Sequence, residues 1–170
     1  MKIGSIGLLM TNINRDISPF NSPLESGVRS LIILLNTYPK PIDIQLIVEL
    51  DYFVLHSADI GGPSSLHAAL PYRSGELLIR RGLIENGLML FISRGLVERV
   101  MSSEGIAYIA SDSASPFIDS LKSNYIKKLK NCAEWVVNRF SNELYDNNLL
   151  GNGGAQLWRQ QFQPIERFKK

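Results

Sequence analysis

Four side chains in this sequence of 170 residues have chemistry that could serve catalysis or bind a metal: His56, Asp59, His67 and Cys132. Imidazole, carboxylate and thiolate groups all bind zinc, but the spacing of these four matches no regular zinc site. Cys132 also lies in the apolar stripe of a predicted helix, where a thiol is buried and inert. We therefore predict structural or partner-contact roles for these residues, with no bound metal and no other cofactor.

The other signatures of an enzyme are also missing from the sequence. The glycine clusters at 61–62 and 151–154 lack the Gly-Lys-Ser/Thr ending of a phosphate loop, and neither lies between a strand and a helix. The acidic residues are scattered, so no carboxylate pair suggests general acid–base catalysis. The sequence therefore predicts a protein that is not an enzyme.

The composition limits the class of protein and its compartment. The formal net charge is only +2, so no overall basic field attracts nucleic acid, while an apolar content of 45% is enough for a core. The single cysteine cannot form an internal disulfide, and the first residues do not resemble a signal peptide. No segment reaches the roughly 18 apolar residues that span a bilayer. These observations predict a cytoplasmic protein without membrane contact.

Two helices are predicted in the first third of the chain. The first begins at Ser22, an N-cap with Glu25 as its capping-box partner, and ends at a proline-rich turn. The second begins at the N-cap Asp43. Its apolar stripe predicts that Glu49 and Asp51 face outward.

The region after residue 73 is predicted to form helices and then a hairpin. Gly82 and Gly87 interrupt its apolar pattern, which predicts two short helices joined by a glycine-containing turn. The second of these helices ends at Gly95 in the C′ position. Near-alternating apolar residues at 96–101 and 106–110 flank a short turn and predict a β-hairpin.

The last predicted helix restarts at Ser115 and Pro116 and has the clearest amphipathic pattern in the chain. Its apolar stripe continues to Phe140. Its opposite face carries the lysines, namely Lys122, Lys127, Lys128 and Lys130.

Together these elements predict a mainly α-helical fold with a small β-hairpin, in the form of a winged helix-turn-helix-like core plus flanking helices. The hairpin directly after a glycine-capped helix is typical of this arrangement, because the wing begins where the third helix ends. We divide the chain into an N-terminal arm at 1–20, a winged-helix-like domain at 21–140 and a C-terminal tail at 141–170. The arm is either an edge strand or a segment that orders on a partner, and the tail is expected to order only on a partner.

The segment from Ser57 to Arg73 is a long polar connection, rich in glycine and proline, between two apolar helical regions. Loops of this length inside a compact domain usually act as lids, clamps or partner-binding loops. The segment therefore predicts a docking surface for a partner.

Nucleic acid is the main alternative partner. A winged helix can place its third helix in the major groove, but residues 85–94 expose few groups that read bases. We therefore expect no sequence-specific reading, while contact with the phosphate backbone stays open. The candidates for this contact are Arg80, Arg81, Arg94, Arg99, Lys127 and Lys128.

Several motifs, in this order along the chain, are similar to those of a known family. They are PFNSPLE at 19–25, YPKPID at 38–43, HSADIGGPSSLH at 56–67, RSGELL at 73–78, GLV at 95–97 and GIAY at 105–108. Over about residues 19–140 the chain resembles the middle component of ABC three-component systems, the group that includes the small subunit of Lamassu-type antiphage defence.

This resemblance implies a non-catalytic adaptor that bridges an SMC-like ABC ATPase and a nuclease-type effector. The adaptor would help to keep the effector inactive until DNA is sensed, and it would meet DNA through the complex. The resemblance carries over no catalytic residues. It marks a structural or docking loop at Asp59, Gly61, Gly62, Pro63 and Arg73. The alternative is a winged-helix transcriptional regulator that binds DNA as a homodimer.

Overall fold

The structure is a computed structural model that describes residues 22–68, 73–103 and 105–142. The predicted arm at 1–20 and the predicted tail beyond residue 142 lie outside these ranges. The helices are α1 Pro23–Thr37, α2 Ile44–Leu55, the 3₁₀ helix η1 Ser57–Ile60, α3 Arg73–Ser93, α4 Ala114–Ser120 and α5 Asn124–Arg139. The strands are β1 Ile42–Asp43, β2 Val97–Ser102 and β3 Gly105–Ala110. The predicted fold class, mainly α with a small β-hairpin, is confirmed.

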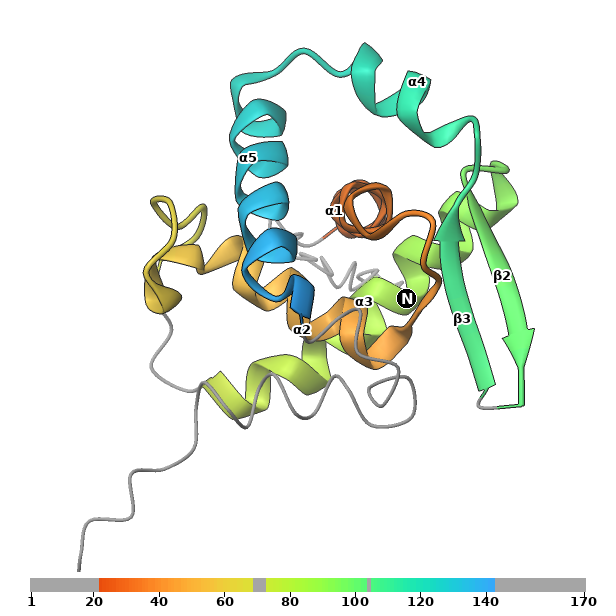
Figure 1. Ribbon diagram of the computed structural model, residues 1–170, viewed down its shortest axis with the longest axis horizontal. Helices are drawn as coiled ribbons and strands as arrows, with labels where there is room; N and C mark the ends of the chain where they lie inside the picture. The colour runs from red at the N-terminus through yellow and green to blue at the C-terminus, as the bar shows by residue number, and fades with distance from the viewer. Residues whose placement is uncertain (1–21, 69–72, 104, 143–170) are drawn as a thin grey trace, which may run out of the picture.

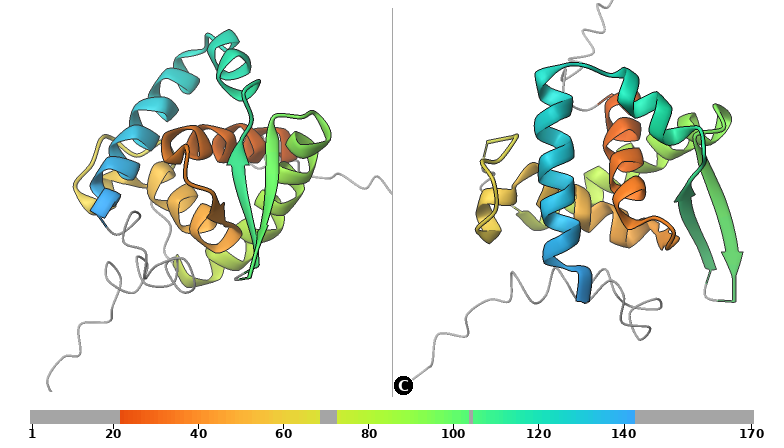
Figure 2. Two further views of the ribbon diagram at one scale, coloured as in Figure 1. Left: turned by 45° about the vertical axis from the view of Figure 1, so that its right-hand side comes forward. Right: turned by 45° about the horizontal axis from the view of Figure 1, so that its top comes forward.

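The helices surround α1, which is seen end-on in the middle of Figure 1. The helix α5 lies on one side of α1 and the β2–β3 hairpin on the other, and both views in Figure 2 show the same separation. The short helix α4 connects the hairpin to α5, while α2 and α3 cover a further side of α1. Segments from both halves of the described chain therefore meet on α1.

The sheet has three antiparallel strands in the order β1-β3-β2. The predicted hairpin is confirmed, and its register runs from Val97 opposite Ala110 to Ser102 opposite Gly105. The strand β1, in which Ile42 pairs with Tyr108 of β3, is not predicted by the sequence pattern. A strand of two residues is too short to show the apolar–polar alternation that identifies strands in a sequence. Its pairing with β3 therefore depends on how the rest of the chain packs. The order α1-β1-α2-α3-β2-β3 is compatible with the predicted winged helix-turn-helix-like core.

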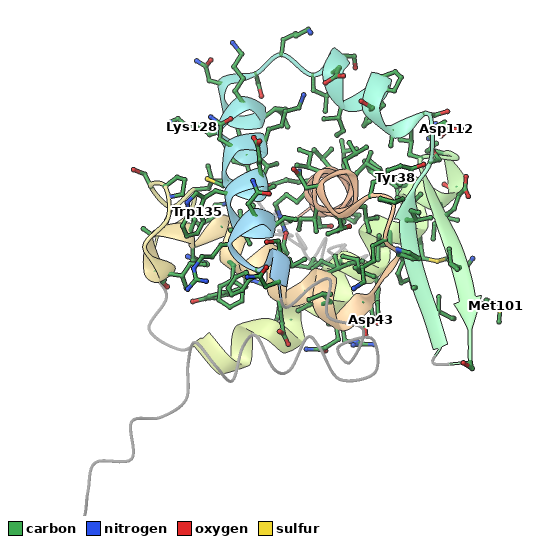
Figure 3. The ribbon with its side chains drawn as sticks, in the orientation of Figure 1. Tyr38, Asp43, Met101, Asp112, Lys128 and Trp135 are labelled. Atoms are coloured by element: carbon green, nitrogen blue, oxygen red, sulfur yellow. The ribbon has the colours of Figure 1, made fainter. Side chains whose placement is uncertain are left out.

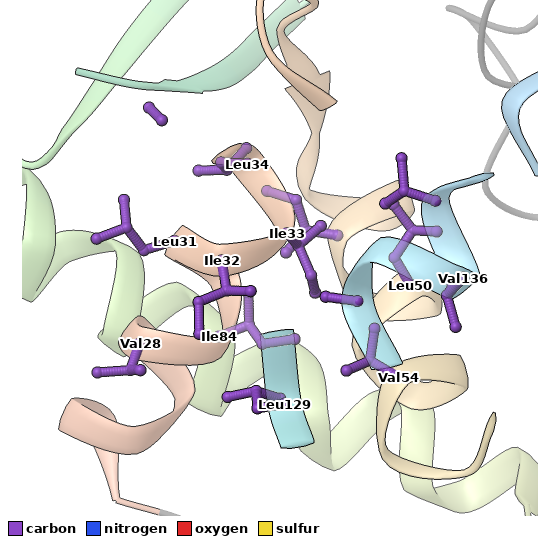
Figure 4. Close-up of a cluster of buried hydrophobic side chains, with 14 of the residues drawn as sticks. Val28, Leu31, Ile32, Ile33, Leu34, Leu50, Val54, Ile84, Leu129 and Val136 are labelled. Atoms are coloured by element: carbon purple, nitrogen blue, oxygen red, sulfur yellow. The ribbon is translucent and has the colours of Figure 1, made fainter. Parts of the chain in front are cut away.

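The apolar core lies between α1 and the helices packed around it. Figure 4 shows it as a continuous cluster of side chains, with Leu31 and Ile33 of α1, Leu50 of α2, Ile84 of α3 and Leu129 of α5. All five side chains are buried. Because four helices contribute, the burial of apolar area depends on their mutual placement rather than on any one helix.

Helix starts agree with the predicted capping residues. Ser22 Oγ accepts a hydrogen bond from the backbone N–H of Glu25 at 3.1 Å, and Asp43 Oδ1 accepts one from Leu46 at 2.7 Å. The predicted restart of helix near residue 115 is confirmed by α4. The prediction of a single helix from there to Phe140 is wrong, because α4 ends at Ser120 and Ser123 caps a separate helix, α5.

The predicted break at Gly82 and Gly87 is wrong, because α3 is one continuous helix. Gly87 lies where α3 crosses α1. A Cβ at Gly87 would lie 2.6 Å from the backbone nitrogen of Gly27. At the same crossing, Ser26 Oγ of α1 donates a hydrogen bond to the carbonyl of Leu83 at 2.8 Å. Gly87 therefore serves a close helix–helix approach and not a turn.

The end of α3 is the predicted glycine cap. Gly95 has a φ of +69°, its N–H bonds the carbonyl of Ile92, and the N–H of Leu96 bonds the carbonyl of Phe91. This pair of bonds ends the helix on a left-handed residue. The chain then turns directly into β2, which fixes the hairpin against the end of α3.

Candidate functional site

Asp51 of α2 lies at the centre of a buried ion-pair cluster that joins three helices. Its carboxylate accepts hydrogen bonds from Arg29 Nε of α1 at 2.7 Å and from Arg80 Nη1 of α3 at 2.9 Å. Asp51 is 0% exposed, and the two arginines are 1% and 6% exposed. The prediction that Asp51 and Glu49 face outward is therefore wrong, since both are buried. The sequence did hold a signal: α2 is apolar on nearly every side, which is typical of a buried helix.

The electrostatics of this cluster keep Asp51 ionised. Burial alone would raise the pKa of Asp51, but the guanidinium groups of Arg29 and Arg80 hold this pKa below its ordinary value of 3.8. Burial opposes the charged form of Arg29 as well, yet Asp51 raises the pKa of Arg29. Loss of Asp51 would remove the carboxylate that faces both guanidinium groups in a region of low dielectric, which strongly destabilises a protein. The cluster therefore fixes how α1, α2 and α3 pack together.

The cluster reaches a fourth helix through Glu25. Glu25 Oε1 accepts a hydrogen bond from Arg29 Nη1 at 3.1 Å and a second one from the Tyr125 hydroxyl of α5 at 3.0 Å. Burial and the neighbouring Glu25 both raise the pKa of Tyr125, so its hydroxyl keeps its proton and remains a donor. The sequence pattern predicts Glu25 only as a capping-box residue and gives no sign of this second role. We call Glu25, Arg29, Asp51, Arg80 and Tyr125 the polar cluster.

The two histidines lie beside the polar cluster. His56 Nε2 is 3.5 Å from Arg80 Nη2, and the His56 and His67 ring centroids are 6.4 Å apart. Burial, Arg29 and Arg80 lower the pKa of His67, so His67 is neutral at neutral pH. Among the residues in the three described ranges, no group of three His, Cys, Asp or Glu side chains is placed to hold a metal ion.

The first part of the predicted docking loop is packed onto α5. After η1, Gly61 adopts a φ of +79°, a left-handed conformation that favours glycine. A Cβ at Gly62 would lie 2.5 Å from the ring of Trp135, so this residue is also restricted to glycine. Ser57 Oγ donates a hydrogen bond to the carbonyl of Pro63 at 2.9 Å and approaches Cys132 Sγ at 3.6 Å. This part of the loop therefore forms a defined wall beside α5.

The two charged positions of the loop lie on different elements. Asp59 is exposed, and its carboxylate accepts a hydrogen bond from the Tyr52 hydroxyl at 3.3 Å. Arg73 is the first residue of α3. Residues 69–72 between them lie outside the described part of the chain. Asp59 therefore lies in η1, which directly precedes Gly61, Gly62 and Pro63, and the docking role of these residues and of Arg73 stays a prediction.

The basic residues predicted to contact nucleic acid do not form one surface. Arg80 is buried on Asp51, so its assignment as an exposed phosphate contact is wrong. Arg81 is partly exposed and pairs with Glu85 at 3.1 Å. The exposed residues fall into two groups, namely Arg94 and Arg99 near the hairpin and Lys127 and Lys128 on α5. Figure 1 shows the hairpin and α5 on opposite sides of α1, and Figure 3 labels Lys128 on the side of α5 away from the hairpin.

These observations define a small, mainly helical domain with a three-stranded antiparallel sheet. Buried ion pairs in this domain connect α1, α2 and α3. The chain belongs to the ABC-three component (ABC-3C) system Middle Component 2 family, which matches residues 19–151. The predicted resemblance to a middle component is therefore confirmed. No curated protein and no solved structure gave a significant match. In the described part of the chain, no helix is long and apolar enough to cross a membrane.

Proposed function

We propose that this middle component is a non-catalytic adaptor of a Lamassu-type antiphage defence complex. It bridges an SMC-like ABC ATPase and a nuclease-type effector, and it helps to keep the effector inactive until DNA is sensed. The observation that carries this proposal is the family match over residues 19–151, which identifies a component of a multi-protein system.

The fold supports a bridging role in two ways. The polar cluster ties α1, α2, α3 and α5 together, which gives a rigid body able to hold two partners at a fixed distance. The hairpin also presents apolar side chains to solvent. Met101 and Ile106 are cross-strand partners on one face and are 83% and 46% exposed. An exposed apolar pair of this kind is typical of a protein–protein contact.

Co-expression with the neighbouring genes tests the adaptor directly. The full-length chain should co-purify with an ATPase and an effector encoded beside it, and all three should elute together in size-exclusion chromatography. Nuclease activity should be low in the complete complex and should rise when duplex DNA is added. An effector that is equally active with and without this subunit would contradict the inhibitory role, while failure to bind either neighbour would contradict the adaptor.

The second candidate is a winged-helix regulator that binds DNA as a homodimer. It is favoured by the exposed Arg94 and Arg99, which lie at the end of α3 and on the adjoining strand β2. The isolated chain would then bind a pseudo-palindromic duplex tightly, and Arg94→Ala with Arg99→Ala would weaken this binding and reduce its salt dependence. Fluorescence anisotropy at two salt concentrations separates the candidates, because the adaptor binds duplex DNA poorly by itself.

A further inference from the structure

A pocket of about 450 Å³ lies between the loop that follows η1 and the first half of α5. One wall is residues 63–66. The other is the face of α5 that carries Asn124, Lys128, Asn131 and Cys132 at helical spacing. Figure 3 shows Lys128 and Trp135 on the side of α5 toward this loop. The volume lies in the range of sites that hold a few side chains or a small ligand.

The loop wall is held in place by hydrogen bonds to the end of α2 and to η1. The backbone N–H groups of Leu66 and His67 both donate to the carbonyl of Leu55, at 2.9 and 3.2 Å. Gly62 packs against the ring of Trp135, and Ser65 Oγ accepts a hydrogen bond from the N–H of Ala58. The pocket is therefore formed before any occupant arrives, which reduces the ordering entropy lost on binding.

The charge of the lining selects an anion. Among the lining residues that belong to the described part of the chain, Lys128 carries a charge and none is a carboxylate. The helix α5 begins at Asn124, so the partial positive charge of its N-terminus lies at the same end of the pocket. Beside these groups, Pro63 and Leu66 provide partly exposed apolar surface. The lining therefore complements a carboxylate next to an apolar side chain.

Duplex DNA fits this surface less well than a protein segment does. The phosphates of a duplex lie on a convex surface, and a protein usually contacts several of them at once with exposed lysine and arginine side chains. The loop at 63–66 stands as a wall beside Lys128. The neighbouring Lys127 is exposed too but lies outside the lining. A phosphate backbone would use both lysines, whereas an inserted side chain would use only Lys128.

We propose that this pocket docks an acidic segment of a partner subunit, with one carboxylate on Lys128 and an adjoining apolar side chain over Pro63 and Leu66. This inference rests on the adaptor function and names a docking surface for it. The loop at 63–66 and α5, which line the pocket, lie on one side of α1 and the apolar hairpin lies on the other (Figure 1), so two partners can be bound at once.

The test uses the full-length chain and the purified ATPase and effector encoded beside it. Lys128→Glu places like charges together and should weaken binding of one of these partners by at least about tenfold. Lys127→Glu is the matched control, because it makes the same charge change one residue away and outside the pocket. Affinities are measured by biolayer interferometry, and melting temperatures establish that each variant is folded.

A second pair of variants tests the shape of the pocket without changing charge. Asn131→Trp fills the pocket and should weaken binding of the same partner by at least about tenfold, since a bulky ring occupies the space that the inserted side chain needs. Asn138→Trp is the control, on an exposed position of α5 outside the lining. Its binding should stay at the wild-type level.

Each remaining outcome refutes a stated part of the argument. Partner binding by the wild type that is unchanged in Lys128→Glu and Asn131→Trp overturns the pocket but leaves the adaptor function standing. Equal losses in Lys127→Glu and Lys128→Glu overturn the pocket in favour of a diffuse basic surface. If the lysine variants lose binding to duplex DNA but keep binding to the partner, Lys127 and Lys128 contact nucleic acid and the pocket proposal is overturned. A wild type that binds neither neighbour refutes the adaptor function and the pocket with it.

Discussion

Replacement of Asp51 by Asn should destabilise the protein strongly while keeping the shape of the side chain. One carboxylate, 0% exposed, accepts hydrogen bonds from both Arg29 and Arg80, at 2.7 and 2.9 Å. Removing one member of a buried ion pair typically costs about 3–5 kcal/mol; here both guanidinium groups lose the carboxylate of Asp51, while Arg29 keeps its bond to Glu25. Single domains have only about 5–15 kcal/mol of stability, so this loss is a large part of the total.

Urea unfolding at neutral pH, followed by circular dichroism, measures the effect on stability. Asp119→Asn is the control, since Asp119 is an exposed carboxylate that pairs with Lys130 at 2.8 Å on the surface. Exposed ion pairs contribute little, so this control should keep the wild-type midpoint. An Asp51→Asn variant with the wild-type midpoint would refute the conclusion that the polar cluster holds the helices together.

A combined replacement separates lost pairing from lost packing. Replacing Arg29, Asp51 and Arg80 together by Met, Leu and Met removes all three charges and keeps apolar volume. Such replacements of buried ionic groups are often neutral or stabilising, so the triple variant should be more stable than Asp51→Asn. A triple variant that is less stable than Asp51→Asn would show that the stability depends on the specific geometry of these side chains and not on the balance of their charges.

Acid unfolding gives an independent measure of the same cluster. The folded-state pKa of Asp51 is below its ordinary value of 3.8. Its contribution to stability is therefore complete above that value and is lost as the pH falls through the lower, folded-state pKa. Asp51→Asn lacks a group that titrates there, so its stability should depend less steeply on pH at the acid end than that of the wild type.

Three further predictions concern the helix crossing, the loop and the histidines. Gly87→Ala should destabilise by about 1–3 kcal/mol, because its Cβ would lie 2.6 Å from the α1 backbone. Gly82→Ala on the same helix has no atom within 4 Å of its Cβ and should stabilise by up to about 1 kcal/mol; equal effects in urea unfolding would contradict the close crossing. Gly62→Ala should push the loop away from Trp135 and speed amide hydrogen exchange across 57–68, whereas unchanged exchange would show that this contact does not hold the loop. Because the pKa of His67 is lowered from 6.5, stability should fall as the pH drops below that value; thermal melts of His67→Gln should show a smaller fall, and a wild-type slope would assign the effect to other groups.

Much of the local structure could be predicted from the sequence because it depends on neighbouring residues. Ser22 and Asp43 cap their helices through bonds that span three residues. Gly95 ends α3 in a left-handed conformation that few other residues adopt. The hairpin follows from two alternating runs and a short turn. The family itself was also accessible, since its motifs are contiguous stretches of sequence.

The helix crossing and the buried ion pairs were harder to predict because the residues that meet there are far apart in the chain. Nothing near Gly87 in the sequence shows that α1 crosses there, so a glycine that permits a close approach was interpreted as a helix break. Arg80 was counted among the phosphate contacts because an arginine in a helical pattern normally faces water. Its partner Asp51 lies 29 residues earlier and on another helix.

By itself, the sequence determined where most helical segments lie, the hairpin, several caps and the family of this protein, since these depend on short-range hydrogen bonds, backbone preferences and contiguous motifs. Only the tertiary structure decided which charges are buried and which walls form a pocket. Glu25 and Tyr125 are 100 residues apart and share a hydrogen bond. Lys128 acquires a pocket only because residues 63–66 pack beside it. Burial and charge pairing are properties of the packed chain, because they depend on how water is excluded from several helices at once.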